Sequence, residues 1–221
     1  MIRLIDAAKT YRLDGVEKCV LEPTTMTLPA GRSIGLLGRN GAGKSTLLRM
    51  IAGTQSLSRG RVAVSGSMSW PVGFAGSFHP DLSAAQNIRF VARIYGVDSD
   101  ELLAFAEDFC DLGQHFRLPC RTYSSGMLAR LAFGASMGIA FDTYLVDEVT
   151  AVGDEAFRAK SNSMFLSRMS RAGAIVVNHS PEVIRQLCDS VLVLEAGRLE
   201  YFGTVEDGLR RHQENLRGPL A

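Results

Sequence analysis

The segment GLLGRNGAGKST, residues 35–46, constrains the fold more than any other part of the chain. Glycine loses more conformational freedom on folding than any other residue, so a cluster of glycines indicates a backbone that must approach another group closely. Gly38, Gly43, Lys44 and Ser45 follow the spacing G-x4-G-K-[ST]. An apolar run precedes them at 32–38, and apolar residues recur at helical spacing over 46–53. We therefore expect a loop between a strand and a helix.

A loop of this kind binds phosphate groups. Its successive backbone N–H groups form a concave nest, and the N-terminus of the following helix favours the same anion. Lys44 is expected to neutralise the β- and γ-phosphates of a nucleotide, and Ser45 to ligate Mg²⁺. The predicted nucleotide contacts of this loop are Gly38, Asn40, Gly41, Ala42, Gly43, Lys44, Ser45 and Thr46.

Composition narrows the class of protein. A chain of 221 residues with 46% hydrophobic residues suits a single domain over 1–221. The net charge of +1 points to neither nucleic acid nor an anionic membrane as a partner. No run approaches the ~18 apolar residues of a membrane span, and no secretory signal is visible. The four cysteines are scattered, which favours reduced thiols in the cytosol over a disulfide framework or a metal site.

Strand and helix signals alternate along the chain and predict an α/β fold with a parallel sheet covered on both faces. Residues 1–13 read as an edge strand, and further strands are expected in 142–148, 174–180 and 190–203. The stretch 83–138 is helical in pattern and is interpreted as an inserted helical subdomain. Residues 206–221 are expected to form a polar C-terminal tail.

Polar residues follow two of these apolar runs. Asp147 and Glu148 end one strand, and adjacent acids are costly to bury without a cation or another partner. At the carboxyl end of a parallel strand they face the ligand crevice, where Asp147 suits a water-mediated Mg²⁺ contact and Glu148 suits a general base. His179 ends the next strand, either to hold a γ-phosphate and the attacking water or as a structural hydrogen-bonding residue.

A serine-glycine turn at Ser124, Ser125 and Gly126 precedes another helical stretch. It is either a second helix N-terminus suited to an anion or an ordinary serine cap.

Four motifs occur in a fixed order over 1–203: the phosphate loop, the serine-glycine turn, the Asp-Glu pair that ends a strand and the histidine that ends another. With these motifs in this order, the chain resembles the nucleotide-binding subunit of an ABC transporter. The resemblance implies a P-loop NTPase (RecA-like) core with an antiparallel β-subdomain and an inserted helical subdomain. It implies ATP and Mg²⁺ as cofactors, with Glu148 and His179 as catalytic residues. YSSGM, residues 123–127, matches the signature loop usually written LSGGQ, and it differs at the first, third and last positions. Residues 150–154 match the D-loop, and Tyr11 is implied to stack on adenine.

The same resemblance implies a homodimer in which Ser124, Ser125 and Gly126 of one copy meet the nucleotide of the other. It also implies two copies of a membrane permease as partners, with the ATPase on the cytoplasmic face of a bacterial inner membrane as a peripheral subunit. One departure is visible. The family's glutamine between the phosphate loop and the helical subdomain is missing, because Gln86 comes too late and reads as part of a helix start. Ser77 or a backbone carbonyl is the expected substitute.

The surface that contacts the permease is expected in the helical block and near 73–81. Trp70, Phe74 and Phe78 belong either to this surface or to the core.

Residues 69–96, 121–134 and 144–154 are similar to the ATP-binding subunits of capsular polysaccharide exporters. Some O-antigen subunits carry an extra C-terminal sugar-binding domain, for which 221 residues leave no room, so export of a capsular polysaccharide bound by the permease is the expected function. Export of O-antigen or teichoic acid is the alternative. A soluble ABC-type ATPase that acts on ribosomes or DNA also stays open.

Overall fold

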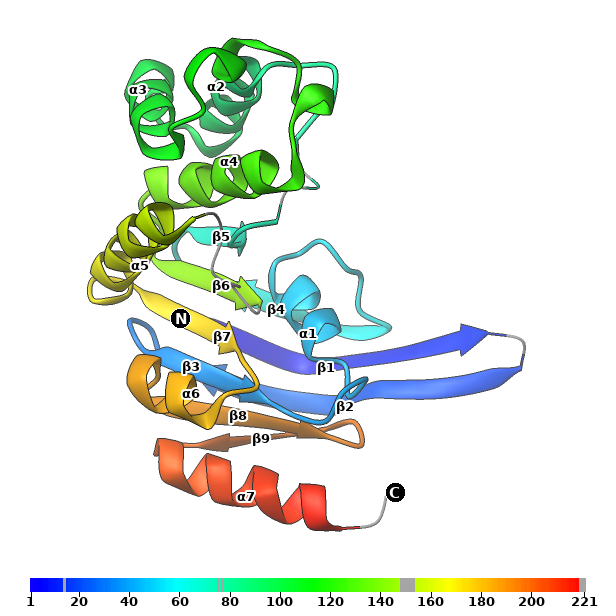
Figure 1. The fold of residues 1–221 in the computed structure, drawn as a ribbon. Coiled ribbons are helices and arrows are strands. Elements are labelled where there is room, and N and C mark those ends of the chain that lie inside the picture. The colour runs from blue at the N-terminus through cyan, green and yellow to red at the C-terminus, as the bar shows by residue number, and fades with distance from the viewer. Residues whose placement is uncertain (14, 75, 77, 148–153, 219–221) are drawn as a thin grey trace. The chain divides into compact units, whose positions relative to one another are not determined.

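The computed structural model describes residues 1–221 apart from 14, 75, 77, 148–153 and 219–221 (Figure 1). Its contacts divide the chain into two compact units. The core unit comprises 1–69, 141–148 and 171–221, and the helical unit comprises 70–140 and 149–170.

The core unit is built on a parallel sheet. In spatial order the six strands are β5 (Met68–Pro71), β6 (Thr143–Asp147), β7 (Gly173–Val177), β3 (Ser33–Leu37), β8 (Ser190–Glu195) and β9 (Arg198–Phe202). Strands β6, β7, β3 and β8 run parallel, and β9 returns antiparallel to β8. Strands β3 and β7 are buried along their whole length, as expected for central strands with helices on both faces.

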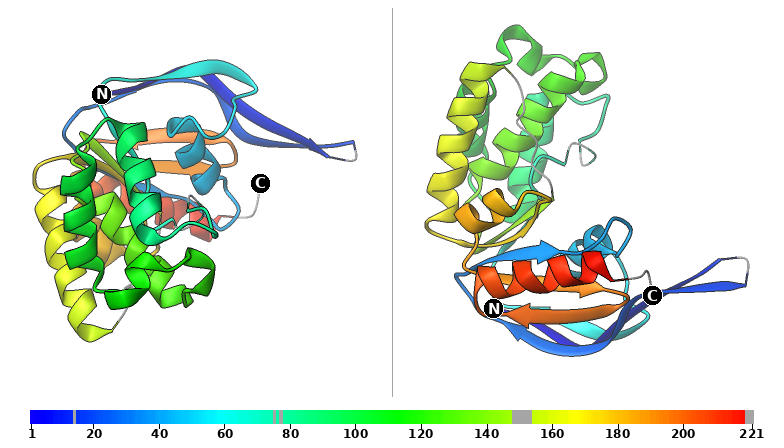
Figure 2. Two further views of the ribbon diagram at one scale, coloured as in Figure 1. Left: turned by 90° about the horizontal axis from the view of Figure 1, so that it is seen from above. Right: turned by 60° about the horizontal axis from the view of Figure 1, so that its bottom comes forward.

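A second, antiparallel sheet has the order β2 (Val16–Leu28), β1 (Ile2–Leu13) and β4 (Arg59–Val64). The prediction that 1–13 forms an edge strand is wrong, because β1 lies between the other two strands. Strand β4 pairs with β1 only between Ile2 and Ala8, so the outer half of β1 pairs with β2 alone. Figures 1 and 2 show this outer half as a two-stranded ribbon that projects from the sheet.

Helix α1 (Lys44–Ile51) packs between the two sheets of the core unit. One buried cluster joins β1 and β2 to α1 and to one face of the parallel sheet; among its members are Leu4, Leu21, Ile34, Leu36, Leu47, Leu48, Ile175 and Leu192. These strand residues alternate with residues that face the opposite side of the sheet, as a period of two requires.

Helices α6 (Pro181–Leu187) and α7 (Val205–Arg217) cover that opposite face. A β-carbon at Gly208 would come within 2.4 Å of Val191, so α7 lies almost on the backbone of β8. The polar tail expected at 206–221 is therefore a helix up to Arg217. It begins with Thr204, whose hydroxyl oxygen accepts a hydrogen bond from the N–H of Asp207.

The helical unit contains α2 (Ala84–Tyr95), α3 (Ser99–Cys110), α4 (Ser125–Gly138) and α5 (Glu155–Met169), with short 3-10 turns η2 (Gly113–Arg117) and η3 (Cys120–Thr122). Helices α2 to α4 fall within the stretch expected to be helical. The Phe109 ring stacks on Phe105 and Phe133 and meets Phe157 edge-on, which ties α3 to α4 and α5.

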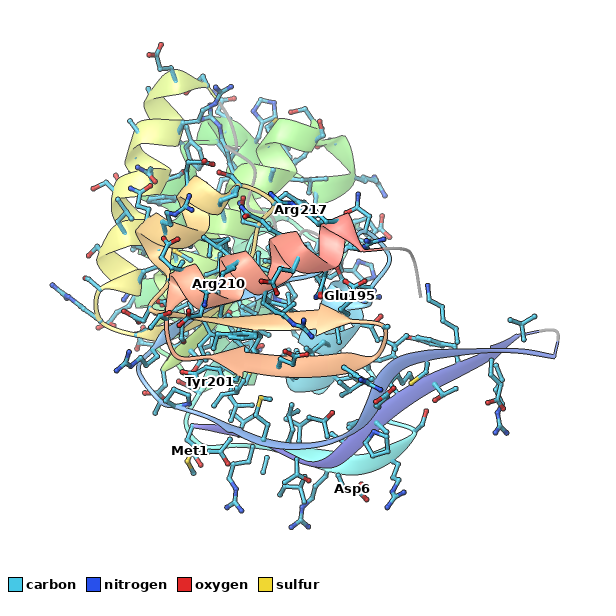
Figure 3. The ribbon with its side chains drawn as sticks, turned by 90° about the horizontal axis from the view of Figure 1, so that it is seen from below. Met1, Asp6, Glu195, Tyr201, Arg210 and Arg217 are labelled. Carbon is cyan, nitrogen blue, oxygen red and sulfur yellow. The ribbon has the colours of Figure 1, made fainter. Side chains whose placement is uncertain are left out.

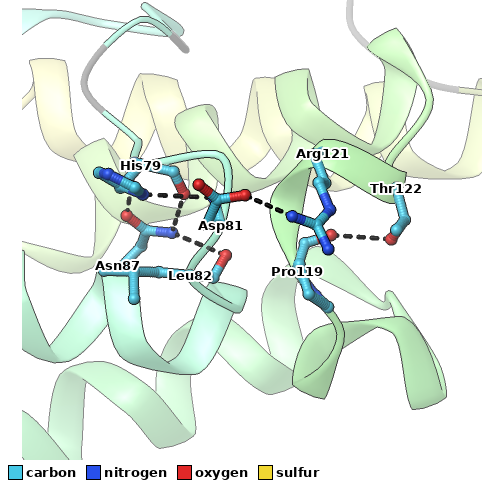
Figure 4. Close-up of polar contacts among 7 residues, drawn as sticks. All are labelled: His79, Asp81, Leu82, Asn87, Pro119, Arg121 and Thr122. Atoms are coloured by element: carbon cyan, nitrogen blue, oxygen red, sulfur yellow. Dashed lines mark hydrogen bonds and ion pairs between the residues drawn. The ribbon is translucent and has the colours of Figure 1, made fainter.

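Asn87 organises the loop that leads into α2 (Figure 4). Its buried side chain donates to the carbonyl oxygens of His79, Leu82 and Ser83, and its own oxygen accepts from the N–H of His79. Arg121 forms an ion pair with Asp81 and so fastens the same loop to η3. A buried amide that is satisfied on both sides fixes one backbone path for residues 79–83.

Candidate functional site

A cleft of about 410 Å³ opens in the core unit beside the glycine-rich loop. It is lined by Tyr11, Lys18, Val20, Asn40, Gly41, Gly43, Lys44, Ser45, Thr46, Val177 and His179. The cleft thus brings together Tyr11, most of the predicted phosphate loop and His179. Gly38 and Ala42 belong to the loop but do not line the cleft. Lys18, Val20 and Val177 line it without having been predicted.

The loop needs glycine at its two signature positions because its neighbours lie so close. A β-carbon on Gly38 would come within 2.4 Å of the carbonyl oxygen of Leu194. One on Gly43, where φ is +106°, would come within 2.2 Å of Cγ1 of Val20. The loop is therefore held between β8 and β2, and its curvature depends on the absence of these side chains.

The start of α1 offers its N–H groups to a ligand. Gly43 stands at the N-cap and supplies no side-chain hydrogen bond, and the first turn of α1 contains no acidic residue. The first turn of a helix directs N–H groups and the positive end of the helix dipole outward, so the start of α1 is suited to an external anion. Ser45 and Thr46 lie in this first turn and place two hydroxyl groups at the cleft.

Lys44 is buried, and its ammonium group lies within the loop. Nζ donates to the carbonyl oxygens of Gly38 at 2.8 Å and of Arg39 at 3.1 Å. A buried lysine held by carbonyl dipoles keeps its charge close to where a phosphate chain would lie. These residues fit a nucleotide triphosphate, since the loop offers N–H donors and an ammonium group together.

Tyr11 and Lys18 face each other across the β1–β2 pair, and both line the cleft. The ammonium of Lys9 lies 4.8 Å from the centroid of the Tyr11 ring and donates to the carbonyl oxygen of Ser56 at 2.7 Å. One ring face of Tyr11 is thereby fixed by a cation–π contact. The tyrosine ring itself is 40% exposed and offers a flat apolar surface at the cleft.

Two polar residues, Asp147 and His179, stand at or just after the ends of the neighbouring parallel strands β6 and β7. Val177 ends β7 and is in register with Asp147 at the end of β6, and His179 follows two residues after Val177. Asp147 is half-buried and does not line the cleft itself. Within the described ranges no group of three or more His, Cys, Asp or Glu side chains gathers for a metal. Ser45 offers a hydroxyl oxygen at the cleft and Asp147 a carboxylate at the end of β6, and oxygen atoms of these kinds are the ligands that Mg²⁺ takes from proteins.

The serine-glycine turn is the N-terminus of α4 in the helical unit. The Oγ atom of Ser124 accepts from the N–H of Met127 at 3.2 Å, and Ser124, Ser125 and Gly126 are all exposed. Tyr123, which replaces the usual leucine, is buried, and its hydroxyl donates to the carbonyl oxygen of His115 at 2.6 Å. Burial raises the pKa of Tyr123 to about 12, so the phenol stays protonated.

Several predicted residues lie outside the described part of the chain, namely Glu148, residues 150–153 of the D-loop and Ser77. Asp154, the last D-loop residue, is described. It caps α5 by accepting from the N–H of Phe157 at 2.9 Å, and it pairs with Arg130. The Phe157 N–H, with help from Arg130, lowers the pKa of Asp154.

Gln86 forms a capping box with Ser83, which confirms that it belongs to the start of α2. Three aromatic residues were expected either on a permease-contacting surface or in the core. Of these, Phe78 is buried, and Trp70 packs against Tyr95 with ring centroids 5.1 Å apart. Phe74 is 56% exposed.

Comparisons with known proteins place this chain in a family. The ABC transporter family profile matches residues 21–151. The polysialic acid transport ATP-binding protein KpsT of Escherichia coli is 39% identical, over 96% of each chain. The capsule polysaccharide export ATP-binding protein CtrD of Neisseria meningitidis is 42% identical, over 91% of this chain and 94% of that protein. The O-antigen export system ATP-binding protein RfbB of Klebsiella pneumoniae is 35% identical, over 88% of this chain and 80% of that protein.

Among solved structures, a dimeric ATP-binding cassette in a post-hydrolysis state, bound to ADP and Pi, superposes with a TM-score of 0.73 at 19% identity. That match covers 91% of this chain and 98% of the cassette. It confirms the predicted fold, a P-loop NTPase core with an antiparallel sheet and a helical insertion. In the part of the chain that the structure describes, none of the helices has the length and apolarity needed to cross a bilayer. The chain belongs to the ABC transporter family and carries that family's ATP-binding domain.

Proposed function

We propose that this chain is the ATP-hydrolysing subunit that energises export of a capsular polysaccharide across the inner membrane through a separate permease. The observation that supports ATP hydrolysis most directly is the cleft that Tyr11, the phosphate loop and His179 line together. The substrate class is supported by the identity to relatives whose names specify capsule polysaccharide export and polysialic acid transport. O-antigen export is the second candidate, and the lower identity to RfbB makes it the weaker one.

In this proposal the chain's own residues bind and orient ATP. The N–H groups at the start of α1 and the ammonium of Lys44 hold the phosphates, and the exposed face of Tyr11 carries the adenine. Ser45 and Asp147 would hold Mg²⁺, which would supply positive charge to stabilise the phosphate oxygens during transfer of the γ-phosphoryl group. His179 holds the γ-phosphate and the attacking water in line. Glu148, outside the described residues, accepts the proton of that water.

The active assembly is proposed to be a homodimer. A single phosphate loop leaves one side of the γ-phosphate open, and the exposed N-terminus of α4 in a second copy is suited to close it. Ser124 is already ordered as the N-cap of α4, and its hydroxyl group would donate a hydrogen bond to the γ-phosphate. The N–H groups of Ser125 and Gly126 would add two more donors. ATP then joins the two copies, hydrolysis separates them, and this cycle drives two permease subunits. The chain is accordingly placed on the cytoplasmic face of the membrane.

The chemistry is tested on the purified chain with a fluorescent ATP analogue and a phosphate-release assay. We expect Lys44→Ala to lose nucleotide binding, because the buried ammonium is removed. Glu148→Gln is expected to keep binding and to lose turnover, since the amide cannot accept a proton. An unchanged hydrolysis rate in the Glu148→Gln protein would contradict the assignment of the base.

The transport role is tested by affinity isolation of the tagged chain from native membranes, with mass spectrometry of the proteins and glycans retained. Recovery of a permease together with capsular glycan supports the proposal. O-antigen glycan in its place supports the second candidate. Recovery with ribosomes or DNA, and with no permease, would contradict both.

A further inference from the structure

Arg39 stands in a variable position of the phosphate loop, yet its side chain makes specific contacts outside that loop. Its Nη2 atom donates to the carbonyl oxygen of Gly218 at 2.8 Å and also to that of Asn215. Both carbonyl groups belong to the C-terminal end of α7. The Arg39 side chain is 17% exposed and does not line the cleft. An arginine of the loop therefore caps a helix that is more than 170 residues away in sequence.

The backbone of the same residue contacts the lysine that is expected to bind phosphate. The carbonyl oxygen of Arg39 accepts from Nζ of Lys44 at 3.1 Å. One residue thus touches the Lys44 ammonium with its main chain and the end of α7 with its side chain. Any displacement of the last turn of α7 would be transmitted to the loop through a single residue.

The charges around Arg39 favour this arrangement. The last carbonyl groups of a helix carry partial negative charge, and a cation there typically contributes 0.3–1 kcal/mol. The carboxylate of Glu195, at the end of β8, adds a second negative group, with its Oε1 atom 3.4 Å from Nε of Arg39. Figure 3 shows Glu195 beside the C-terminal half of α7. The planar guanidinium directs Nη2 to the carbonyl oxygens of α7 and Nε towards Glu195, from positions that are fixed relative to each other.

The rest of α7 is held independently of the loop. Gly208 rests on Val191 of β8, and Arg211 forms two hydrogen bonds to Glu200 of β9, at 2.9 and 3.1 Å. The first two turns of α7 therefore have anchors of their own on the sheet. The capping contacts at Asn215 and Gly218 link the phosphate loop to an element that is already fixed in place.

We infer that Arg39 is a positioning residue that holds the phosphate loop in its nucleotide-accepting shape by tethering it to the last turn of α7. The inference rests on the proposed ATP site. A glycine-rich loop has many accessible conformations, and each tether removes some of those that cannot bind phosphate. Nucleotide in the cleft and the docked end of α7 stabilise each other, because coupling between two sites is reciprocal.

The experiment compares the wild-type chain with Arg39→Met, which keeps an unbranched apolar stem but removes the charge and the hydrogen-bond donors. Arg211→Met is the matched control, since it removes an arginine anchor of the same helix without touching the loop. Arg39→Lys keeps the positive charge but loses the planar guanidinium group with its several N–H donors. Each protein is assayed for affinity for a fluorescent ATP analogue, for thermal stability, and for amide hydrogen exchange of residues 213–218 with and without nucleotide.

In the wild-type chain we expect nucleotide to slow exchange at the end of α7. Arg39→Met is expected to bind the analogue about tenfold more weakly, within the usual range of coupling between sites, and to lose the effect of nucleotide on exchange. Arg39→Lys is expected to lie between these two proteins. Arg211→Met is expected to melt earlier yet to bind nucleotide within about twofold of wild type, because the tether is intact.

Two results would overturn the inference. One is wild-type affinity in Arg39→Met, with nucleotide still protecting α7. The other is that, in the wild-type chain, nucleotide does not change amide exchange at residues 213–218. This second result is decisive even if Arg39→Met fails to fold. A wild-type chain that binds no nucleotide would contradict the proposed function instead, so the two failures are distinct.

Discussion

The Nζ atom of Lys18 lies 3.2 Å from the carbonyl oxygen of Gly41, so a second lysine reaches the phosphate loop from strand β2. Lys18 also lines the cleft, whereas Arg12 on the same ribbon pairs with Glu17 and does not. The positive charge facing the expected phosphate chain therefore comes from two lysines, Lys44 at the start of α1 and Lys18 on strand β2.

Lys18→Met is predicted to weaken nucleotide binding about fivefold, because an exposed charge close to a phosphate contributes on the order of 1 kcal/mol. The loss should shrink as salt is raised, since the interaction is screened. Affinity measured at low and high ionic strength provides the check. Arg12→Met, which removes one charge from the same ribbon, is the control and should bind as wild type. An equal loss in both variants would mean that net charge alone acts.

Gly134→Ala is predicted to destabilise the chain by about 1–3 kcal/mol through overpacking. The new methyl group would come within 2.4 Å of Sγ of Cys110, where α4 crosses α3. Cys110→Ala removes that sulfur, so the double variant Gly134→Ala/Cys110→Ala should recover stability relative to the sum of the single changes. Urea unfolding of the four proteins measures the coupling, and strict additivity would argue against this contact.

His212 is predicted to make stability fall as the solution is acidified. Burial, with smaller effects of Lys44, His179 and Arg39, lowers its pKa below 6.5, while Glu195 opposes the shift. The unfolded chain then binds a proton that the folded chain resists, so stability declines as pH drops below about 6.5. His212→Gln should flatten this part of the profile. Urea midpoints at several pH values test it, and identical slopes for both proteins would exclude His212 as the cause.

The four thiols are predicted to differ sharply in reactivity. Cys19 is exposed, whereas Cys110 and Cys120 are buried and Cys188 is partly covered. Burial raises the pKa of Cys110 and of Cys188 to about 12, so neither forms the thiolate that alkylating reagents attack. Brief native treatment with iodoacetamide should modify Cys19 first, as read by peptide mass spectrometry. The other three should react after denaturation, and early modification of Cys110 would contradict the packing of α3 on α4.

Much of the site follows from local sequence. The phosphate loop is set by Gly38, Gly43 and Lys44, whose roles depend on the strand and helix next to them. His179 follows from an apolar run that ends in a polar residue. Lys18 gave no comparable signal, because it reaches the loop through the pairing of β1 with β2, which is a tertiary contact. Arg39 gave none either, since its partners lie at the end of α7.

The helices show the same limit. Helix α2 was expected from its apolar spacing and has a capping box at Ser83 and Gln86. The sequence of helix α7 predicts a polar tail because few of its residues are apolar, and only Gly208 and Leu209 among those described are buried. Its stability comes from packing on β8 and from ion pairs with the sheet, which a pattern of apolar residues does not reveal.

The projecting ribbon of β1 and β2 has a consequence for which nucleotides the cleft accepts. In the proposed complex the phosphates would meet a loop held between two sheets, whereas the base would meet one aromatic ring on a strand pair that β4 no longer supports beyond Ala8. Because the face of a flat ring can stack on any purine, we expect weak discrimination between adenine and guanine in the proposed ATP site. The contacts to the triphosphate are then expected to decide which small molecules bind.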